Sequence, residues 1–197
     1  MTRTPHIAII IGSTRDTRWA DKPAQWMLKQ AQARTDMTVE LVDLRDFDLP
    51  LFNEPASNAF MPSSDPAAVA WQQKLAEFDG YIFVVAEYNH SVTGSLKNAL
   101  DQAYVEWGRK PMGYIGYGGL GAARAVEHLR GIGVELAMVP VRNAVHIGGG
   151  DFYRVGPYNK AAEPIEAIES SIGASCKLLL DDMVWWAGAT LAAKAAS

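Results

Sequence analysis

The sequence predicts an α/β fold in which helices cover both faces of a parallel β-sheet. Apolar runs of strand length alternate five times with helical patterns along the chain. Two of these runs, HIAIII and YIFVVA, are apolar on both faces, which is typical of parallel strands buried on both sides. Strands that alternate with helices imply right-handed crossovers and therefore a doubly wound sheet.

The expected strands are rich in isoleucine, valine and aromatic residues, and they cover His6–Ile11, Thr38–Val42, Tyr81–Ala86, Met112–Tyr117 and Met138–Ile147. Apolar residues at helical spacing place the expected helices at Trp19–Thr35, Pro66–Phe78, Gly94–Trp107, Ala122–Leu136 and Lys160–Ala195. Five strands in this arrangement suggest the flavodoxin-like order 2-1-3-4-5, with one helical layer on each face of the sheet. We expect residues 1–197 to form one flavodoxin-like domain, because this length suits a single core.

Composition narrows the class of protein. The chain is 49% hydrophobic and 20% charged, which is ordinary for a globular fold and too apolar for a disordered one. A net charge of -4 argues against nucleic acid as the main partner, since binding to a phosphate backbone needs a basic face. The single cysteine, Cys176, cannot form an intrachain disulfide and is expected to be buried in a helix. No apolar run has the length of a membrane span, so we expect a cytoplasmic protein.

The segment Arg45–Asp65 is long for a connection between elements and contains both polar and apolar residues. Long loops in compact domains are commonly functional. We expect this segment to form a rim of the site or to contact a partner subunit.

Ligands of open parallel sheets bind beyond the carboxyl ends of the strands, near the point where strand order reverses. The loop after the first strand, GSTRDTRW, brings two hydroxyls and two arginines to a helix start. Free N–H groups at such a start and charge-assisted donors from Arg15 and Arg18 suit a phosphate group. The other interpretation is a capped helix start with solvated arginines. The chain has no GxxxxGK[ST] motif, which argues against an NTPase.

The loop after the third strand, AEYNHSVTGS, places a polar cluster beyond the most apolar strand. Asn89 offers both a donor and an acceptor to the edge of a heterocycle, and Tyr88 offers an aromatic face or a hydroxyl. Thr93 is expected to cap the helix that follows. No histidine, cysteine or carboxylate spacing indicates a metal site, and no Ser-His-Asp arrangement is indicated.

The loop after the fourth strand contains GYGGLG, which formally matches the GxGxxG dinucleotide fingerprint. That fingerprint belongs to the first strand–helix unit, and its acidic residue ends the next strand. Here Glu135 instead precedes an apolar run. We interpret the motif as a glycine turn that lets the backbone approach a flat ligand closely.

Together these loops resemble the NADPH-dependent FMN reductase family, which comprises flavodoxin-like quinone and azo reductases. The resemblance rests on four ordered matches in the first two thirds of the chain, namely GSTR at 12–15, LPLFNEP at 49–55, EYNHSVTGSLKNALD at 87–101 and GGLGAARA at 118–125. Three positions depart from the family pattern. Ala86 and Thr93 stand where the family has proline, which is expected to cost loop stiffness, and Tyr117 replaces a residue that is commonly small and polar.

The resemblance implies a site for FMN and names the residues that would form it. Ser13, Arg15 and Arg18 with Trp19 would hold the phosphate. Ala86, Glu87, Tyr88 and Asn89 would line the isoalloxazine, and Ser91 would support their loop. Tyr117, Gly118 and Gly119 would close the other side of the ring.

The implied activity is hydride transfer from NADPH or NADH, through bound FMN, to a quinone, an azo compound, free flavin or a similar small-molecule acceptor. The flavin carries this chemistry, so no side chain is named as a catalytic acid or base. The alternatives are a non-enzymatic electron-transfer flavodoxin, a Rossmann protein that binds NAD through GYGGLG, and a flavin-free interaction module on the same fold. The resemblance also implies a homodimer or homotetramer, and Trp185 beside Trp186 in a helical tail agrees with an interface.

Overall fold

The computed structural model describes residues 3–196 and contains a six-stranded parallel sheet in the order β2-β1-β3-β4-β5, with β6 paired to β4 beside β5. The strands are β1 His6–Ile11, β2 Thr38–Asp43, β3 Gly80–Ala86, β4 Pro111–Tyr117, β5 Val139–Pro140 and β6 Val145–Ile147. The α/β class and the predicted order 2-1-3-4-5 are therefore confirmed. The expected fifth strand at 138–147 is split into two short pieces, which pair with opposite ends of β4.

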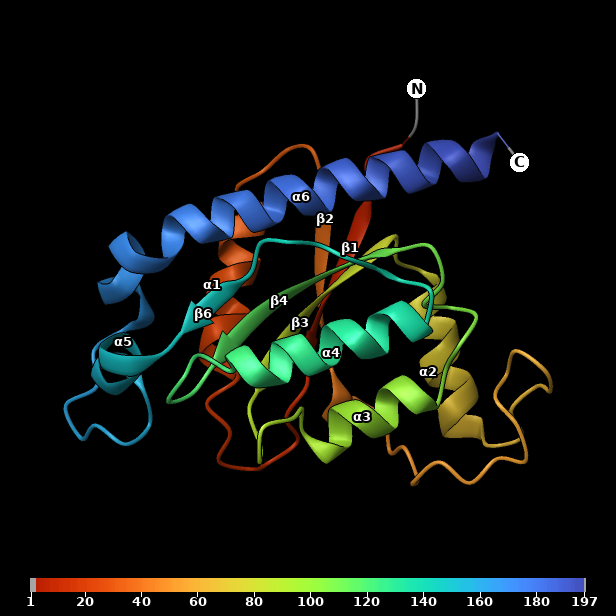
Figure 1. Ribbon diagram of the computed structural model, residues 1–197, viewed down its shortest axis with the longest axis horizontal. Coiled ribbons are helices and arrows are strands. Elements are labelled where there is room, and N and C mark those ends of the chain that lie inside the picture. Colours follow the sequence, from red (N-terminus) through yellow and green to blue (C-terminus); the bar gives the residue numbers. More distant parts are fainter. Residues whose placement is uncertain (1–2, 197) are drawn as a thin grey trace.

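Six helices surround this sheet (Figure 1), and they are α1 Asp21–Gln32, α2 Pro66–Ala76, α3 Gly94–Asp101, α4 Ala123–Glu135, α5 Gly149–Val155 and α6 Glu169–Ala195. Short 3-10 turns η1 Leu44–Asp46 and η2 Ile165–Ile168 precede the long loop and α6. Two expectations differ from the structure. The helix expected to reach Trp107 ends at Asp101, and the one expected from Lys160 begins only after Pro164, which cannot continue a hydrogen-bonded turn.

Two apolar cores lie on opposite faces of the sheet. On β1, Ile7, Ile9 and Ile11 pack with α1 and α6, whereas Ala8 and Ile10 pack with α2, α3 and α4. This alternation explains why the strands have no polar face, since both faces are covered. Cys176 lies in the first core and is 2% exposed, as the sequence predicts. Among residues 3–196, no helix combines the length and hydropathy needed to cross a bilayer, although α6 has 27 residues.

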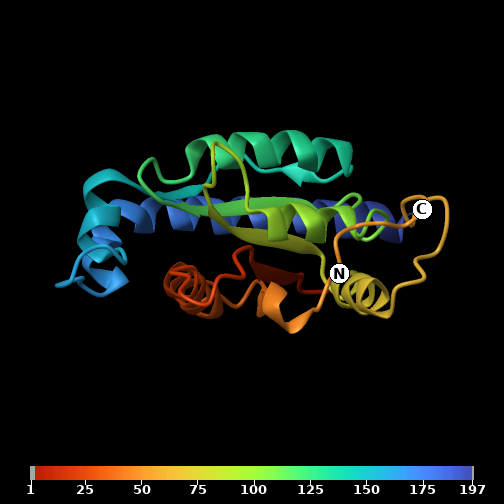
Figure 2. The same ribbon diagram turned by 90° about the horizontal axis from the view of Figure 1, so that it is seen from below.

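The carboxyl ends of β1, β3, β4 and β6 bring four loops to one edge of the sheet. The glycine-rich turn after β4 is hydrogen-bonded to the segment after β6, through Gly118 N–H to the Ile147 carbonyl and Gly149 N–H to the Gly119 carbonyl. Both views show α5 and the loop that follows it at one end of the molecule, beside the turn after β4 (Figures 1 and 2). The last third of the chain therefore contributes to the edge where ligands of such sheets bind.

The segment 45–65 is fastened to α3 at its first part. The side chains of Asn98 and Gln102 donate to the Pro50 carbonyl at 2.8 and 2.6 Å, and Phe52 N–H donates to Asn98. Its middle remains exposed, with Phe60 87% accessible. The LPLF part of the segment thus lines a groove beside α3, together with Thr14 and Arg45. A role of this segment as a rim of the site stays a prediction.

Candidate functional site: a flavin-type pocket at the sheet edge

The loop after β1 carries a run of unpaired backbone donors. Gly12 N–H donates to the Val84 carbonyl and Arg18 N–H to the Arg15 carbonyl. Between them, the backbone N–H groups of Ser13 to Thr17 have no hydrogen-bond partner among residues 3–196. Ser13 is buried, whereas Thr14 to Thr17 are exposed to solvent. Five consecutive donors that no other group of the described chain uses are open to water or to an anion such as a phosphate group.

Arg15 is the cation of this loop that remains available to a ligand. Its side chain is exposed and forms no ion pair with any residue from 3 to 196. The hydroxyl of Tyr88, in the loop after β3, raises the pKa of the Arg15 guanidinium through a hydrogen bond. Arg15 thus reaches across the pocket from one loop to the next, and an incoming ligand can replace this weak contact at little cost.

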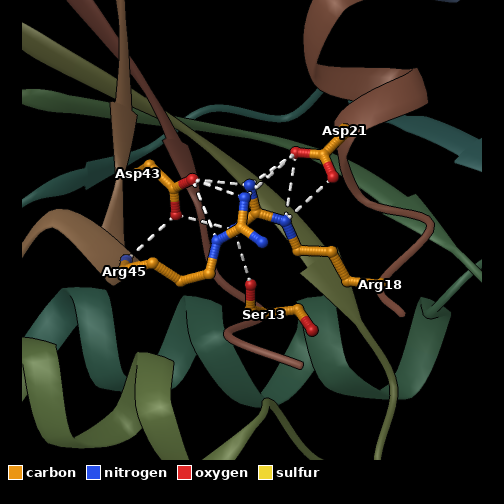
Figure 3. Close-up of polar contacts among 5 residues, drawn as sticks. All are labelled: Ser13, Arg18, Asp21, Asp43 and Arg45. Atoms are coloured by element: carbon orange, nitrogen blue, oxygen red, sulfur yellow. Dashed lines mark hydrogen bonds and ion pairs between the residues drawn. The ribbon is translucent and has the colours of Figure 1, made fainter. Parts of the chain in front are cut away.

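Arg18 is oriented differently, because every donor of its guanidinium is already used within the chain (Figure 3). Nε donates to Asp21 at 3.0 Å, one terminal nitrogen donates to the Ser13 carbonyl at 2.9 Å and to Asp43 at 2.6 Å, and the other donates to both carboxylates at 2.5 Å. A guanidinium has five N–H donors. No donor of Arg18 is left for a phosphate, so the sequence-based role of Arg18 as a phosphate ligand needs correction.

The Arg18 cluster ties the loop after β1 to the end of β2. The side chain of Arg18 is 1% exposed, and Asp43, the last residue of β2, is 20% exposed. Burial raises the pKa of Asp43, but hydrogen bonds from Arg18 and Arg45 outweigh it and lower the pKa to about 2. For Arg18, burial lowers the pKa, but the carboxylates of Asp43 and Asp21 outweigh this effect and raise the pKa overall. Because Arg18 also holds the Ser13 carbonyl, it fixes the loop that presents the free N–H groups.

The loop after β3 forms a two-residue turn at the pocket. Tyr88 N–H donates to the Ser91 carbonyl at 2.9 Å, and Ser91 N–H donates back to the Tyr88 carbonyl at 3.0 Å. Asn89 and His90 lie between them with φ of 50° and 69°, as turns of this mirror-image type require. Asparagine and histidine are among the residues that adopt this region more readily than others.

Glu87 joins this loop to α4. Its carboxylate accepts Nε of Arg124 at 2.6 Å and the backbone N–H groups of Arg124 at 3.1 Å and Ala125 at 3.4 Å, all at the start of α4. Burial raises the pKa of Glu87, and these contacts outweigh it and lower the pKa. Ser91 makes a parallel link, since its hydroxyl lies 2.7 Å from Nδ1 of His128 on α4. Glu87 and Ser91 therefore position the pocket wall.

Thr93 performs more than the capping that its sequence context predicts. Its hydroxyl accepts Leu96 N–H at 3.1 Å as the cap of α3, and it also donates to the Gly12 carbonyl. Ser95 donates to the same carbonyl at 3.0 Å. The expected loss of stiffness at Thr93 is thus offset by hydrogen bonds that join the loops after β3 and β1, which a proline at this position could not make.

The glycine-rich turn after β4 follows the interpretation made from the sequence. Gly121 has φ of 62°, and a Cβ there would lie 2.9 Å from Cβ of His146. The turn therefore requires glycine for its backbone path. It follows β4, whereas the dinucleotide fingerprint follows the first strand.

These loops enclose a pocket of about 190 Å³. Nine of the twelve sequence-predicted residues line it: Arg15, Arg18, Trp19, Ala86, Glu87, Tyr88, Tyr117, Gly118 and Gly119. The other three lie next to it. Ser13 is buried and hydrogen-bonded to the Tyr117 hydroxyl, Asn89 is at the exposed tip of its turn, and Ser91 faces His128. Burial raises the pKa of Tyr117, so its phenol stays protonated at neutral pH.

Four further residues line the pocket and were not predicted: Thr17, Phe152, Pro157 and Tyr158. Three of them come from α5 and the loop after it. The sequence holds a signal for them, because GGGDFYRVGPY follows the last apolar run and so begins at the same sheet edge. Trp19 secures this segment by donating its indole N–H to the Val155 carbonyl at 3.1 Å.

The pocket agrees in chemistry with a flavin phosphate ester. It offers free N–H groups and one available cation at the first loop, with aromatic and glycine walls at the loops after β3 and β4. Its volume is below that of pockets for drug-sized ligands, which start at roughly 300 Å³. Arg15 and Tyr88, which both line the pocket, are exposed and hydrogen-bonded to each other.

The similarity of this chain to known proteins also points to a flavin site. The family model described as NADPH-dependent FMN reductase matches residues 5–151. An NAD(P)H-dependent FMN reductase of Nectria sp. is 36% identical over 129 residues, which cover 62% of this chain and 64% of that protein. A 2-hydroxy-1,4-benzoquinone reductase of Burkholderia sp. is 35% identical over 140 residues, or 68% of this chain and 72% of that protein. The matched part is thus about two thirds of each relative.

A solved structure shares the fold over nearly the whole chain. The flavoenzyme NAD(P)H:(acceptor) oxidoreductase FerB of Paracoccus denitrificans superposes with a TM-score of 0.70 and 21% identity. The superposition covers 94% of this chain and 98% of that one. It supports the architecture, including the region after β6 that the family model does not reach.

Proposed function

Since the chain belongs to the NADPH-dependent FMN reductase family, we propose that it is an FMN-dependent NAD(P)H oxidoreductase whose acceptors include quinones. The observation that carries the proposal is the run of five free N–H groups beside Arg15, at the edge where the aromatic and glycine loops meet. FMN, when bound, would supply the chemistry for hydride transfer between NAD(P)H and the acceptor.

The residues of the first loop hold the cofactor phosphate in this proposal. The N–H groups of Ser13 to Thr17 donate to its oxygens, and Arg15 adds a charge-assisted donor. Arg18 stabilises the conformation of this loop through its hydrogen bonds to Asp43 and Asp21. Arg18 is therefore a positioning residue, and Arg15 is the ligand.

In this proposal Ala86–Asn89 would line one side of the isoalloxazine and Tyr117–Gly119 the other. Glu87 and Ser91 orient the first wall through α4, as their contacts with Arg124 and His128 indicate. Neither Glu87 nor Tyr117 is suited to exchange a proton near neutral pH, because Glu87 is held ionised by Arg124 and Tyr117 is held neutral by burial.

Self-association as a homodimer or homotetramer is part of the same proposal. On α6, Trp185 is 65% exposed and Leu178, two turns earlier, is 51% exposed. Trp185 packs edge-on against Trp186 with ring centroids 4.8 Å apart. Exposed apolar residues that line one helix face are typical of an interface. We place the protein in the cytoplasm and expect no nucleic acid partner.

The test is an FMN titration followed by turnover. We expect the purified protein to bind one FMN per chain, and NAD(P)H to bleach that flavin under nitrogen until a quinone restores the colour. Steady NAD(P)H oxidation by the isolated protein distinguishes the enzyme from an electron-transfer flavodoxin. A protein that takes up no flavin would contradict the proposal and favour a flavin-free module.

A further inference from the structure

Aromatic rings from three separate parts of the chain form one continuous wall of the pocket. Trp19 lies 5.2 Å from Tyr117 and 5.4 Å from Phe152 between ring centroids. Phe152 in turn meets Tyr158 at 6.3 Å in an edge-to-face arrangement of 81°. All four rings line the same pocket. These separations are within the range of favourable ring–ring contacts.

Tyr158 contributes almost nothing to the folded core. It is 80% exposed, and within the described part of the chain its one ring contact is with Phe152. An exposed ring of this size gains no burial energy at its position. Its face therefore remains available to a partner in the pocket, which Tyr88 also lines from the loop after β3.

The segment that carries Tyr158 is held in place on both sides. Arg154 forms a two-armed ion pair with Glu163, both arms 2.6 Å long, and donates to the Ala167 carbonyl at 3.0 Å. Glu163 N–H returns a hydrogen bond to the Arg154 carbonyl at 3.2 Å. The loop 155–162 is thus closed at its base. A ring on a closed loop loses less conformational entropy on binding than a ring on a free one.

Charge in the pocket restricts what this ring can bind. The carboxylate of Glu87 is paired with Arg124, and Arg18 is saturated by Asp21 and Asp43. Around Tyr158 the wall is aromatic, and Arg15, which lines the same pocket, is close enough to Tyr158 to interact with it electrostatically. Such a surface favours a flat aromatic ligand that is neutral or anionic.

We propose that Tyr158, supported edge-on by Phe152, is the platform on which a planar aromatic electron acceptor stacks, and that it selects quinones over non-planar acceptors. The inference rests on the proposed function, because it assigns the acceptor position of that same pocket. It concerns a residue outside the twelve predicted from the sequence. In the proposed function the cofactor is held by other loops, so we expect Tyr158 to act on the acceptor rather than on FMN.

The experiment compares Tyr158→Ala and Tyr158→Phe with the matched control Tyr153→Ala. Tyr153 lies on α5, is 71% exposed and does not line the pocket. Binding of anthraquinone-2-sulfonate to the FMN-loaded proteins is measured by calorimetry without NAD(P)H. Tyr158→Ala is expected to weaken this binding by about 2- to 12-fold, the usual range for a ring–ring contact. Tyr158→Phe and Tyr153→Ala should bind as the native protein does.

Two further readouts separate the acceptor from the cofactor and from the fold. Turnover with ferricyanide, which is octahedral and cannot stack, should be the same in all variants, as should FMN affinity and the thermal midpoint. Unchanged anthraquinone binding in Tyr158→Ala would overturn the inference, as would equal losses in the Ala and Phe variants. A fall in FMN affinity would place Tyr158 on the cofactor and overturn it too. If the native protein binds no FMN, the proposed function itself fails, whatever these variants do.

Discussion

Arg15 and Arg18 lie three residues apart in GSTRDTR, yet their replacement should affect different properties of the protein. Loss of Arg18 should lower the stability of the fold, and loss of Arg15 should lower the affinity for FMN. Arg18 has a 1% exposed side chain and gives all five donors to Asp21, Asp43 and the Ser13 carbonyl. Removing one partner from a buried ion pair costs roughly 3 to 5 kcal/mol. Because Asp21 is 48% exposed and can be rehydrated, we expect about 3 kcal/mol for Arg18→Ala, the lower end of that range. For a domain of this size, the loss lowers the thermal midpoint by roughly 6 to 12 °C.

Arg15→Ala should leave the unfolding free energy within about 0.5 kcal/mol, as is usual for exposed residues without an ion pair. Its effect should fall on the cofactor. A lost charge-assisted hydrogen bond to phosphate is worth about 1.5 to 3 kcal/mol, so the dissociation constant for FMN should rise roughly 10- to 150-fold.

The assay measures urea unfolding of the FMN-free proteins and FMN binding by fluorescence quenching. Arg18→Lys serves as a second variant in case Arg18→Ala does not fold. Lysine keeps the charge but has three donors instead of five, so an intermediate loss of stability is expected. The reasoning is refuted if Arg18→Lys unfolds like the native protein while its FMN affinity falls more than tenfold. It is equally refuted if Arg15→Ala retains full FMN affinity.

Three other predictions follow from the same contacts. Glu87→Gln should lower the unfolding free energy by about 1.5 to 3 kcal/mol in urea titration, since a charged acceptor at the start of α4 is lost. The control Glu127→Gln, on the exposed face of α4, should have no effect. Equal losses of stability in the two variants would contradict the role of Glu87 in joining its loop to α4. The pKa of Asp43 is lowered from 3.8 to about 2, so its contribution is complete above pH 4 and is lost as the pH falls from 4 to 2, about 2 kcal/mol that Asp43→Asn should lack. If the stability of the native protein and of Asp43→Asn fell identically with acid, this contribution of Asp43 would be excluded. Trp185→Ser should reduce the mass measured by light scattering if α6 forms the interface, while Val134→Ser, on exposed α4, should not.

The order of the sheet and the place of the site could be predicted from the sequence because both depend on patterns that are local in the chain. Apolar runs and helical spacing identify the strands, and the loops after β1, β3 and β4 share an edge by topology. Arg18 could not be distinguished from Arg15 in this way. Its assignment depends on Asp43, which lies 25 residues away and meets it only when β2 packs beside β1. Asp21, three residues on, was the one local signal for an ion pair.

The contribution of the last third of the chain was missed for a related reason. The run 138–147 is interpreted as one strand, yet it forms two short strands that pair with opposite ends of β4. The second piece ends at the pocket edge and delivers Phe152 and Tyr158 to the site. Periodicity identifies apolar residues but does not reveal a break that is set by pairing with another strand.

In the proposed function, the free N–H groups of Ser13 to Thr17 and the side chain of Arg15 bind the phosphate of FMN. The most direct measurement is a titration of FMN-free protein with FMN and, in parallel, with riboflavin, which lacks the phosphate. We predict saturation at one FMN per chain, with riboflavin bound at least tenfold more weakly and with the difference reduced in Arg15→Ala. Equal affinity of the native protein for FMN and riboflavin, or no binding of either, would contradict the account.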